Sequence, residues 1–259
     1  MVDYLTELFR LEGKIAALTG AAGYLVSEMA AGFAKAGAGV ALLDIEVGNA
    51  EKVAGKIRAE GGEAIAVRAD VTAKADLERA LDEILRRYGD LDILVNGAGV
   101  NAPTPFLEIA VEEWNRILGV QLTGTMLACQ VFGAHMVKQG KGSIVNISSA
   151  SAGPPLSKAF AYSVAKAGVK NLTQNLAREW AASGVRVNAL RPGFFPTEWS
   201  QKNFLTPERV QAILTHTPMK RFGEPRELVG AVLWLCSEAA SFVTGAEIAV
   251  DGGFSAMTI

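Results

Sequence analysis

The chain has 259 residues, of which 50% are hydrophobic and 20% are charged. This composition excludes a disordered or collagen-like chain and supplies enough apolar side chains for one sizeable core. The 25 Lys and Arg residues against 27 Asp and Glu give a formal charge of −2, and no basic stripe runs along the sequence. We therefore expect no nucleic-acid partner.

Cysteine and histidine are too sparse to indicate a disulfide framework or a metal centre. Cys129 and Cys236 lie in apolar stretches, and His135 and His216 stand without neighbouring ligands at metal spacing. Charged residues interrupt the segment from Met1 to Leu11, so it does not read as a signal peptide, and no long uninterrupted apolar run predicts a membrane span. The sequence predicts a cytoplasmic protein with no metal and no membrane partner.

From Lys14 onward, short apolar runs alternate with longer amphipathic stretches, which is the pattern of βαβ units. The apolar residues of each run are consecutive, as expected for strands covered on both faces. We expect one doubly wound α/β domain of the Rossmann type over residues 1–259, with a central parallel sheet and helices on both faces. In chain order, the expected strands are Ile15–Thr19, Val40–Asp44, Ala64–Arg68, Ile93–Asn96, Ser143–Ser148, Arg186–Arg191 and, at an edge, Glu247–Val250.

The first expected strand leads into a glycine-rich turn, Gly20–Gly23, that opens directly into a helix. Backbone N–H groups at such a helix N-terminus can bind a pyrophosphate. Asp44 ends the second strand, where a carboxylate can accept hydrogen bonds from an adenosine ribose and would repel a 2′-phosphate. No Lys or Arg stands at Ala22 or Ile45, so the sequence predicts NAD, with NADP less favoured.

Two further strand ends carry polar or very small residues. Asp70 follows the third strand, and Asn96–Gly97–Ala98–Gly99 continues from the fourth. Ligands of open α/β sheets bind at the carboxyl ends of the strands. We therefore expect a nucleotide cofactor to lie across these ends.

A tyrosine and a lysine supply candidate reaction chemistry. Tyr162 and Lys166 are spaced i and i+4 in an amphipathic stretch, so both lie on one helical face. A nearby ammonium lowers the pKa of a phenol, about 10 in isolation, and makes proton exchange with an alcohol or ketone feasible. Ser149 follows the preceding strand, and its hydroxyl can bond the same substrate oxygen.

Taken together, these motifs resemble the short-chain dehydrogenase/reductase family in its single-domain form, from Leu11 to Gly253. The resemblance rests jointly on Thr19–Gly20–Ala21–Ala22–Gly23, Asp70, Asn96–Gly97–Ala98–Gly99, Ser149, Tyr162 with Lys166, Pro192–Gly193 with Thr197, and Asp251–Gly252–Gly253.

The resemblance implies a role for each of these residues. Tyr162 is the expected acid/base, Lys166 binds the nicotinamide ribose and lowers the Tyr162 pKa, and Ser149 orients the substrate. It also implies a homotetramer, built partly from the helices around Trp114–Gln139 and Tyr162–Ala182. The predicted cofactor-binding residues are Gly20, Gly23, Tyr24, Leu25, Asp44, Asp70, Val71, Asn96, Gly97, Ala98, Tyr162, Lys166, Pro192, Gly193, Phe195 and Thr197.

The chain departs from the family pattern at two places. Tyr24 and Val26 stand where the family's turn has further glycines, which alters the close approach of the backbone to a pyrophosphate. Gln121 stands where the family usually has an Asn that holds a proton-relay water beside the Lys, and Gln offers the same amide one methylene further out. We count Gln121 with Ser149, Tyr162 and Lys166 as catalytic candidates.

Residues 192–223 form a long, proline-punctuated, aromatic segment that we expect to be a substrate-loop insertion. Its first part resembles members of the family that act on sugar acids such as gluconate or mannonate/fructuronate. Polar side chains expected near the cleft are Asn101, Gln121, Ser151, Lys158 and Lys202. A polyhydroxy acid needs such groups, and a cation near Ser149 and Tyr162 would favour an acid.

Other readings of the same segment remain open. The aromatic residues Phe194, Phe195, Trp199 and Phe204 would suit a small hydrophobic carbonyl, a 3-oxoacyl chain or a steroid. A third reading is a catalytically silent NAD-binding scaffold, supported by the departures at the turn and at Gln121. Against the silent reading stands the presence of Ser149, Tyr162 and Lys166 together. The expected partner is therefore a small alcohol or ketone.

Overall fold

A computed structural model describes residues 4–153 and 156–257, apart from the side chain of Trp199. Its centre is a seven-stranded sheet in the order β3-β2-β1-β4-β5-β6-β7, and every neighbouring pair is parallel. The strands are β1 Ile15–Thr19, β2 Gly39–Asp44, β3 Ala64–Arg68, β4 Ile93–Asn96, β5 Gly142–Ile147, β6 Val185–Pro192 and β7 Glu247–Val250. The predicted parallel α/β fold is confirmed.

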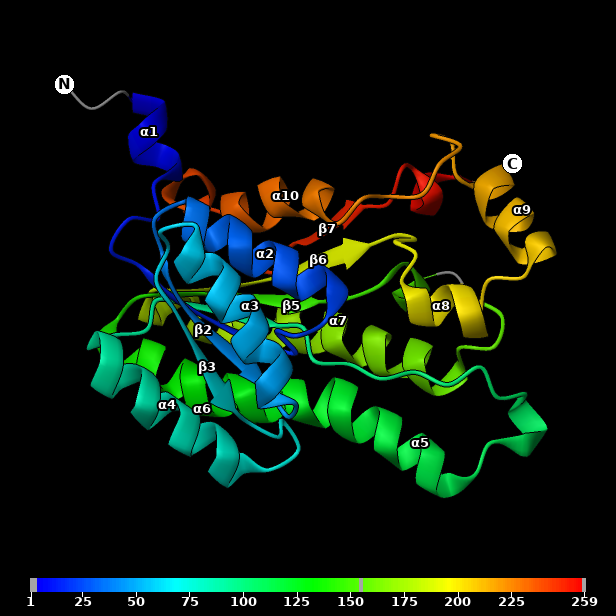
Figure 1. Cartoon of the computed structure of the whole chain (residues 1–259), viewed down its shortest axis with the longest axis horizontal. Coiled ribbons are helices and arrows are strands. Elements are labelled where there is room, and N and C mark those ends of the chain that lie inside the picture. Colours follow the sequence, from blue (N-terminus) through cyan, green and yellow to red (C-terminus); the bar gives the residue numbers. More distant parts are fainter. Residues whose placement is uncertain (1–3, 154–155, 258–259) are drawn as a thin grey trace.

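Helices cover both faces of this sheet (Figure 1). One face carries α2 Tyr24–Lys35, α3 Val47–Ala59 and α10 Arg226–Cys236, which share a buried apolar cluster with the strands. The other face carries α4 Lys74–Tyr88, α6 Gly124–Gln139 and α7 Phe160–Trp180, which share a second cluster. The remaining α-helices are α1 Tyr4–Phe9, α5 Val111–Leu118, α8 Glu198–Asn203 and α9 Pro207–His216.

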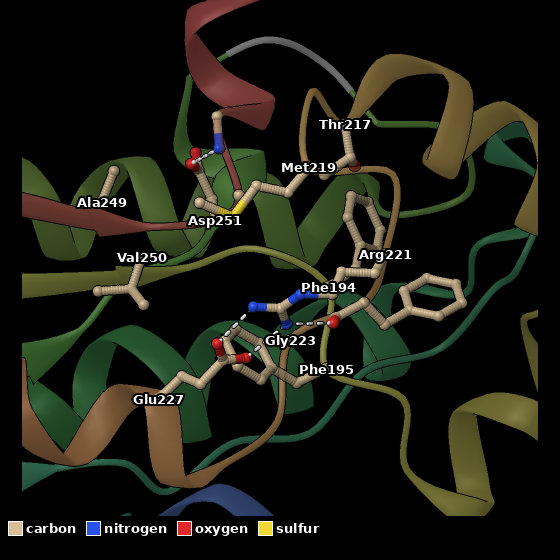
Figure 2. Close-up of a pocket in the computed structure, with 13 residues that line it drawn as sticks. Phe194, Phe195, Thr217, Met219, Arg221, Gly223, Glu227, Ala249, Val250 and Asp251 are labelled. Atoms are coloured by element: carbon tan, nitrogen blue, oxygen red, sulfur yellow. Dashed lines mark hydrogen bonds and ion pairs between the residues drawn. The ribbon is translucent and has the colours of Figure 1, made fainter.

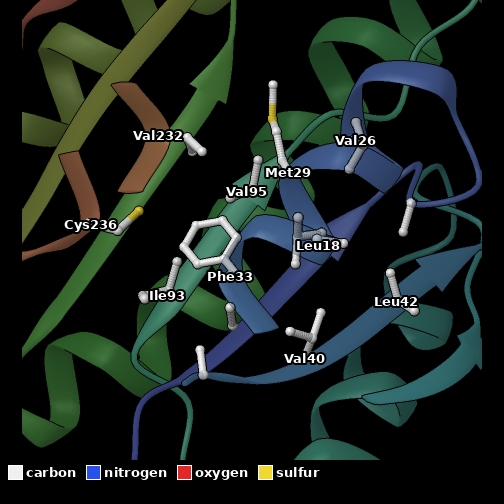
Figure 3. Close-up of a cluster of buried hydrophobic side chains, with 14 of the residues drawn as sticks. Leu18, Val26, Met29, Phe33, Val40, Leu42, Ile93, Val95, Val232 and Cys236 are labelled. Atoms are coloured by element: carbon white, nitrogen blue, oxygen red, sulfur yellow. The ribbon is translucent and has the colours of Figure 1, made fainter. Parts of the chain in front are cut away.

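Alternation along each strand sends successive side chains to opposite faces. Leu18 of β1 belongs to the cluster under α2, whereas its neighbour Ala17 belongs to the cluster under α6. Figure 3 shows Phe33 and Met29 of α2 packed over β1 and β4 in the first cluster. Strands buried on both faces need apolar residues at consecutive positions. For this reason the strand ends predicted from the sequence differ from the observed ends by at most one residue.

The strand order places a topological switch point between β1 and β4. The chain runs from β1 out to β2 and β3 and then returns to β4 on the other side of β1. In open α/β sheets, ligands bind outside the carboxyl ends of the strands at this point. The glycine turn after β1 and the loop after β4 therefore lie where a dinucleotide is expected.

The helix from Val111 to Gln139 comprises α5, a π-helical turn at Gly119–Thr123 and α6, and its length and hydropathy would allow it to cross a membrane. Half of its most apolar window is buried inside the protein. Phe132 and Met136 belong to the core beneath the sheet. Packing against the sheet accounts for the apolar character of this helix.

The segment at 192–223 leaves the carboxyl end of β6 and contains α8 and α9 before the chain reaches α10. In Figure 1 these two short helices lie beyond the carboxyl ends of β5 and β6, on the side where α7 begins. Its expected role in holding substrate stays a prediction.

Candidate active site

The turn between β1 and α2 brings two strand-end loops into direct contact. Gly20 has φ +67°, and a Cβ atom there would lie 2.6 Å from the Ala98 Cα. The Thr19 hydroxyl accepts hydrogen bonds from Gly97 N at 3.1 Å and Ala98 N at 3.3 Å. Glycine is therefore required at position 20, because only its bare backbone permits both the left-handed conformation and this approach.

Two bulky residues at the start of α2, Tyr24 and Val26, have different surroundings. Val26 is buried, and a Cβ atom at Gly97 would lie 2.5 Å from its Cγ2 atom. Gly97 thus provides the space that Val26 occupies. Tyr24 is 52% exposed at the first position of α2, and Leu25 packs against the core cluster of that face. The bulk of Val26 is therefore directed inward, away from a ligand at the helix N-terminus.

Asp44 reaches from the end of β2 to the glycine turn. Its Oδ2 accepts a hydrogen bond from Ala22 N at 2.9 Å, and its Oδ1 accepts one from Glu46 N at 3.0 Å. The carboxylate therefore stands beside the segment that is expected to hold a dinucleotide.

The sheet register also places a cation beside Asp44, which sequence reasoning missed. Arg68 is the register partner of Asp44 on β3. Its Nη1 lies 3.1 Å from Asp76 Oδ2, so its charge is paired. Only strand pairing brings Arg68 here, 24 residues further along the chain, and nothing in the local sequence could have signalled it.

The loop after β3 is held by its own side chains. Asp70 Oδ1 accepts hydrogen bonds from Thr72 N at 2.9 Å and from the Thr72 hydroxyl at 2.7 Å. Val71 is buried, and a Cβ atom at Gly124 would lie 2.7 Å from its Cγ2 atom. Both residues lie at the carboxyl edge of the sheet, and their contacts with a cofactor stay predictions.

The side chain of Asn96 points into the protein interior. Its Nδ2 donates to Asn146 Oδ1 at 2.8 Å, and Asn146 in turn donates to the Thr173 hydroxyl on α7 at 2.9 Å. All three side chains are buried. In this arrangement Asn96 can meet a cofactor only through its backbone, and its amide ties β4 to β5.

The three reaction candidates meet where β5 ends and α7 begins. Lys166 Nζ donates to the Ile147 carbonyl at 2.6 Å and lies 5.6 Å from the centroid of the Tyr162 ring. The Tyr162 and Ser149 side chains share a hydrogen bond. The Ser149 oxygen also accepts hydrogen bonds from Ser151 N at 3.2 Å and from the Ser151 hydroxyl at 3.1 Å. The structure thus brings Ser149, Tyr162 and Lys166 together, whereas no contact links the fourth candidate, Gln121, to them among the described residues.

The expected lowering of the Tyr162 pKa by Lys166 is not seen in the structure, because burial is the largest influence on both titratable groups. Desolvation raises the pKa of Tyr162, while its hydrogen bond with Ser149 lowers the pKa in part. Burial lowers the pKa of Lys166 to about 7. The phenol therefore carries its proton at neutral pH, and Lys166 can change its charge near neutrality.

Gln121 lies in the π-helical turn that joins α5 to α6, and its side chain is buried. Its Nε2 donates to the Val100 carbonyl at 2.8 Å. A Cβ atom at Gly99 would lie 2.7 Å from that Nε2, so the longer glutamine fits because residue 99 has no side chain. The Gln121 Oε1 is buried and has no hydrogen-bond partner among the described residues. Sequence reasoning found Gln121 but not the π-helical turn, a common feature of functional sites.

The segment that follows β6 is fixed to β7 and to α8. Gly193 N donates to the Val250 carbonyl at 3.0 Å. The Thr197 hydroxyl accepts from Ser200 N at 3.0 Å and caps α8. Pro192 is buried at the end of β6, and Phe195 is partly buried against the core cluster under α2 and α10. The cofactor contacts expected of Pro192, Gly193, Phe195 and Thr197 stay predictions.

Two predicted aromatic residues of the substrate loop already have partners. The Phe194 ring lies 5.0 Å from the Phe254 ring, and the Phe204 ring lies 4.0 Å from the Arg209 guanidinium. Phe195 packs inward, and the side chain of Trp199 lies outside the described residues. Phe194 and Phe195 nevertheless line one hollow together, whereas Phe204 does not border it.

A cation missed by sequence reasoning joins this loop to the start of α7. Arg209 of α9 donates to the Ser157 hydroxyl at 2.5 Å and to the Ser157 carbonyl at 3.2 Å. The next residue, Lys158, is exposed and has φ 55°. Lys202 is exposed on α8, and the Asn101 side chain accepts from Ala102 N at 2.8 Å. Arg209 therefore contacts the loop that leads to Tyr162, and Lys158 is part of that loop.

A hollow of about 370 Å³ lies between the loop after β6 and the segment at the end of β7 (Figure 2). Phe195, Gly223 and Val250 line it, and an ion pair between Arg221 and Glu227 closes one side. None of Ser149, Tyr162 and Lys166 borders it. Among the described residues, no cluster of three His, Cys, Asp or Glu side chains is arranged to hold a metal ion.

Comparison with known proteins decides the family. A family model described as Enoyl-(Acyl carrier protein) reductase matches residues 20–255. A galactitol 2-dehydrogenase (L-tagatose-forming) from Cereibacter sphaeroides is 41% identical over 258 residues, covering 98% of this chain and 99% of that protein. The chain belongs to the short-chain dehydrogenase/reductase family.

Solved structures of this family superpose closely on the whole chain. A gluconate 5-dehydrogenase from Burkholderia cenocepacia, in complex with NADP and tartrate, is 32% identical with a TM-score of 0.94, covering 98% of this chain and 100% of that chain. A 7 alpha-hydroxysteroid dehydrogenase complexed with NADH and 7-oxo glycochenodeoxycholic acid is 35% identical with a TM-score of 0.91, covering 98% of each chain. The short-chain dehydrogenase/reductase fold is thus shared along nearly its full length.

Proposed function

We propose that the protein is an NAD-dependent oxidoreductase that interconverts a secondary alcohol and a ketone on a polyol or sugar acid. The observation that carries this proposal is the convergence of Tyr162, Lys166 and Ser149 at the junction of β5 and α7. A scaffold without catalysis has no physical need for a buried lysine whose pKa is lowered to about 7, because burying that ammonium costs stability.

The residues at the switch point fit a dinucleotide. The backbone at Gly20 is bare and faces the loop after β4, and Gly23 caps an α-helix whose first N–H groups are available to an anion. Asp44 stands next to that turn with a carboxylate that can accept hydrogen bonds from ribose hydroxyls. When bound, NAD supplies the carbon that gives or takes the hydride.

Each reaction residue has a distinct role in this proposal. Tyr162 gives a proton to the substrate oxygen during ketone reduction and takes it during alcohol oxidation. In its protonated form, Lys166 favours the phenolate and thereby eases alcohol oxidation. The Ser149 oxygen accepts two hydrogen bonds from Ser151, so its O–H is the group that donates to the Tyr162 oxygen, and a bound substrate oxygen would compete for this O–H.

NAD is favoured over NADP because a 2′-phosphate would lie against the Asp44 carboxylate. The nearest cation by sheet register, Arg68, is paired with Asp76 and is therefore less able to compensate. The relatives divide on this point, since one of the matched structures holds NADP and another holds NADH.

A polar substrate is supported by the cations Arg209 and Lys158 near the start of α7 and by the separate packing of Phe194 and Phe204. A sugar-acid carboxylate would find charge partners there. The galactitol and gluconate relatives support the same class, whereas the steroid-active relative represents the competing, apolar class.

A substrate panel tests the proposal. Formation or loss of reduced nicotinamide should be followed by absorbance with polyols, sugar acids and their keto forms, and with apolar ketones, each with NAD and with NADP. The expected result is turnover of at least one polyhydroxy substrate, with NAD preferred. Turnover of only the apolar ketones would transfer the proposal to that class, and no turnover with any of them would contradict it.

We further propose that the protein works as a homotetramer in the cytoplasm. The helices α5 and α7 carry exposed apolar side chains, including Val111 and Val164, which suit a contact between copies of the chain.

A further inference from the structure

A buried carboxylate lies behind the reaction residues and takes no part in the proposed chemistry. Glu247 is the first residue of β7, and its side chain is 9% exposed. Its Oε1 accepts a hydrogen bond from the Ser148 hydroxyl at 2.7 Å. Its Oε2 lies 3.0 Å from Arg191 Nη1 on β6 and 3.4 Å from Lys170 Nζ on α7. One side chain therefore joins the residue after β5 to β6, β7 and α7.

Ser148 stands between two residues of the reaction site. The carbonyl of Ile147, the preceding residue, accepts the hydrogen bond from Lys166 Nζ. The hydroxyl of Ser149, the following residue, bonds Tyr162. Glu247 thus bonds Ser148, which lies between the residue that bonds Lys166 and the residue that bonds Tyr162.

The charged contacts of Glu247 favour a fixed position for Ser148. A carboxylate out of water is costly unless charged partners and hydrogen bonds compensate it, and here two cations and one hydroxyl do so. Arg191 passes beneath the loop after Ser149, since a Cβ atom at Gly153 would lie 3.8 Å from its Nη1. Movement of Ser148 would break a charge-assisted hydrogen bond that is stronger than a neutral one.

We propose that Glu247, held by Arg191 and Lys170, is a positioning residue that fixes Ser148 and thereby sets the places of the Ser149 hydroxyl and of the Lys166 acceptor. The proposal rests on the proposed function for its kinetic consequence. The alternative is that Glu247 serves only to attach the edge strand β7, in which case its loss would lower stability without altering the reaction step.

The test compares two substitutions at Ser148. Ser148→Ala removes the hydroxyl, whereas Ser148→Thr keeps it. We expect Ser148→Ala to lower kcat about 10-fold with the dissociation constant for NAD nearly unchanged, and to shift the pH profile of kcat. Ser148→Thr should restore most of kcat. The matched control is Glu60→Gln, which removes an exposed ion pair with Lys35 and should change neither quantity.

A double-mutant cycle separates positioning from general damage. Glu247→Ala and Ser148→Ala remove the same contact, so the double variant should lose less than the product of the two single losses. The proposal would be overturned if the double variant lost kcat by the full product of the two single losses. It would also be overturned if Ser148→Ala kept the kcat and the pH profile of the wild type. If Glu247→Ala does not fold, the two Ser148 variants still decide the question.

Amide exchange provides a readout that needs no substrate. Peptides covering residues 147–153 should exchange faster in Ser148→Ala and Glu247→Ala than in the wild type and in Glu60→Gln. If the wild type turns over no substrate, the proposed function fails, while this measurement still tests the positioning. Unchanged exchange in both variants would contradict the positioning role whatever the activity.

Discussion

The residue that governs cofactor choice in this account is Asp44. Asp44→Asn keeps the side-chain shape and an acceptor for Ala22 N but removes the negative charge. Because repulsion of a 2′-phosphate then disappears and Arg68 stands on the neighbouring strand, the preference for NAD over NADP should fall about 10-fold. Dissociation constants from fluorescence titration give this ratio.

The matched control for Asp44 is Glu46→Gln, which removes a nearby exposed charge that does not contact the glycine turn through its side chain in the described structure. It should leave the ratio near that of the wild type. A wild-type protein that binds NADP more tightly than NAD, or an unchanged ratio in Asp44→Asn, would contradict the role given to Asp44.

The burial of Lys166 should affect the free energy of unfolding as well as catalysis. Its pKa is lowered from 10.5 to about 7 by burial, so between these values the unfolded chain binds more protons than the folded one. Stability therefore rises with pH across this window, by up to about 1.4 kcal/mol per pH unit. Lys166→Met should lack this rise and should be more stable than the wild type at neutral pH.

Denaturant unfolding of both proteins from about pH 7 to pH 9 measures this difference, because all other titrating groups are shared. Parallel pH profiles for the wild type and Lys166→Met would show that the ammonium is not desolvated as the structure indicates.

At the scale of elements, the π-helical turn between α5 and α6 packs closely against the loop after β4. The contact is possible because Gly99 in that loop has no side chain. Gly99→Ala places a methyl group against the Gln121 amide, at 2.7 Å from its Nε2. Overpacking of this kind costs about 1 to 3 kcal/mol. We expect a lower melting temperature and a lower kcat, since Gln121 is one of the catalytic candidates.

Gly119→Ala is the matched control, because it lies in the same π-helical turn and has no atom within 4 Å of its Cβ position. It should leave the melting temperature equal or slightly higher, as alanine does in helical segments. An equal fall in melting temperature and kcat in Gly99→Ala and Gly119→Ala would show that the region is sensitive to any added side chain rather than to the contact with Gln121.

Sequence patterns predicted the elements more completely than the contacts between them. The strands could be found because burial on both faces demands consecutive apolar residues, and Tyr162 and Lys166 could be paired because helical spacing is local. Arg68 beside Asp44, Asn96 bonded to Asn146, and Glu247 bonded to Ser148 depend on which strands are neighbours. Strand order is a long-range property, so no local signal announces these contacts.

At the scale of the whole molecule, the proposed homotetramer predicts that one apolar surface is buried between copies. Val164→Glu introduces a charge on the exposed side of α7, where the side chain is 49% exposed. Burial of an unpaired charge is unfavourable, so the variant should show a smaller mass by light scattering. Val47→Glu on α3, on the other side of the sheet, is the control and should leave the mass unchanged.

A wild-type mass equal to that of one chain would contradict the tetramer, as would a Val164→Glu variant whose mass is unchanged.

The central claim is that Tyr162 exchanges the proton with the substrate oxygen, and substitution of its hydroxyl tests this most directly. Tyr162→Phe keeps the ring and removes the proton, whereas Tyr4→Phe makes the same change at an exposed tyrosine of α1. The measurement is kcat/KM for the preferred substrate of the panel, with NAD affinity determined in parallel. The account predicts a loss of about 10²-fold or more in Tyr162→Phe, with NAD affinity nearly unchanged and Tyr4→Phe equal to the wild type. A Tyr162→Phe protein that retains most of its turnover would contradict it.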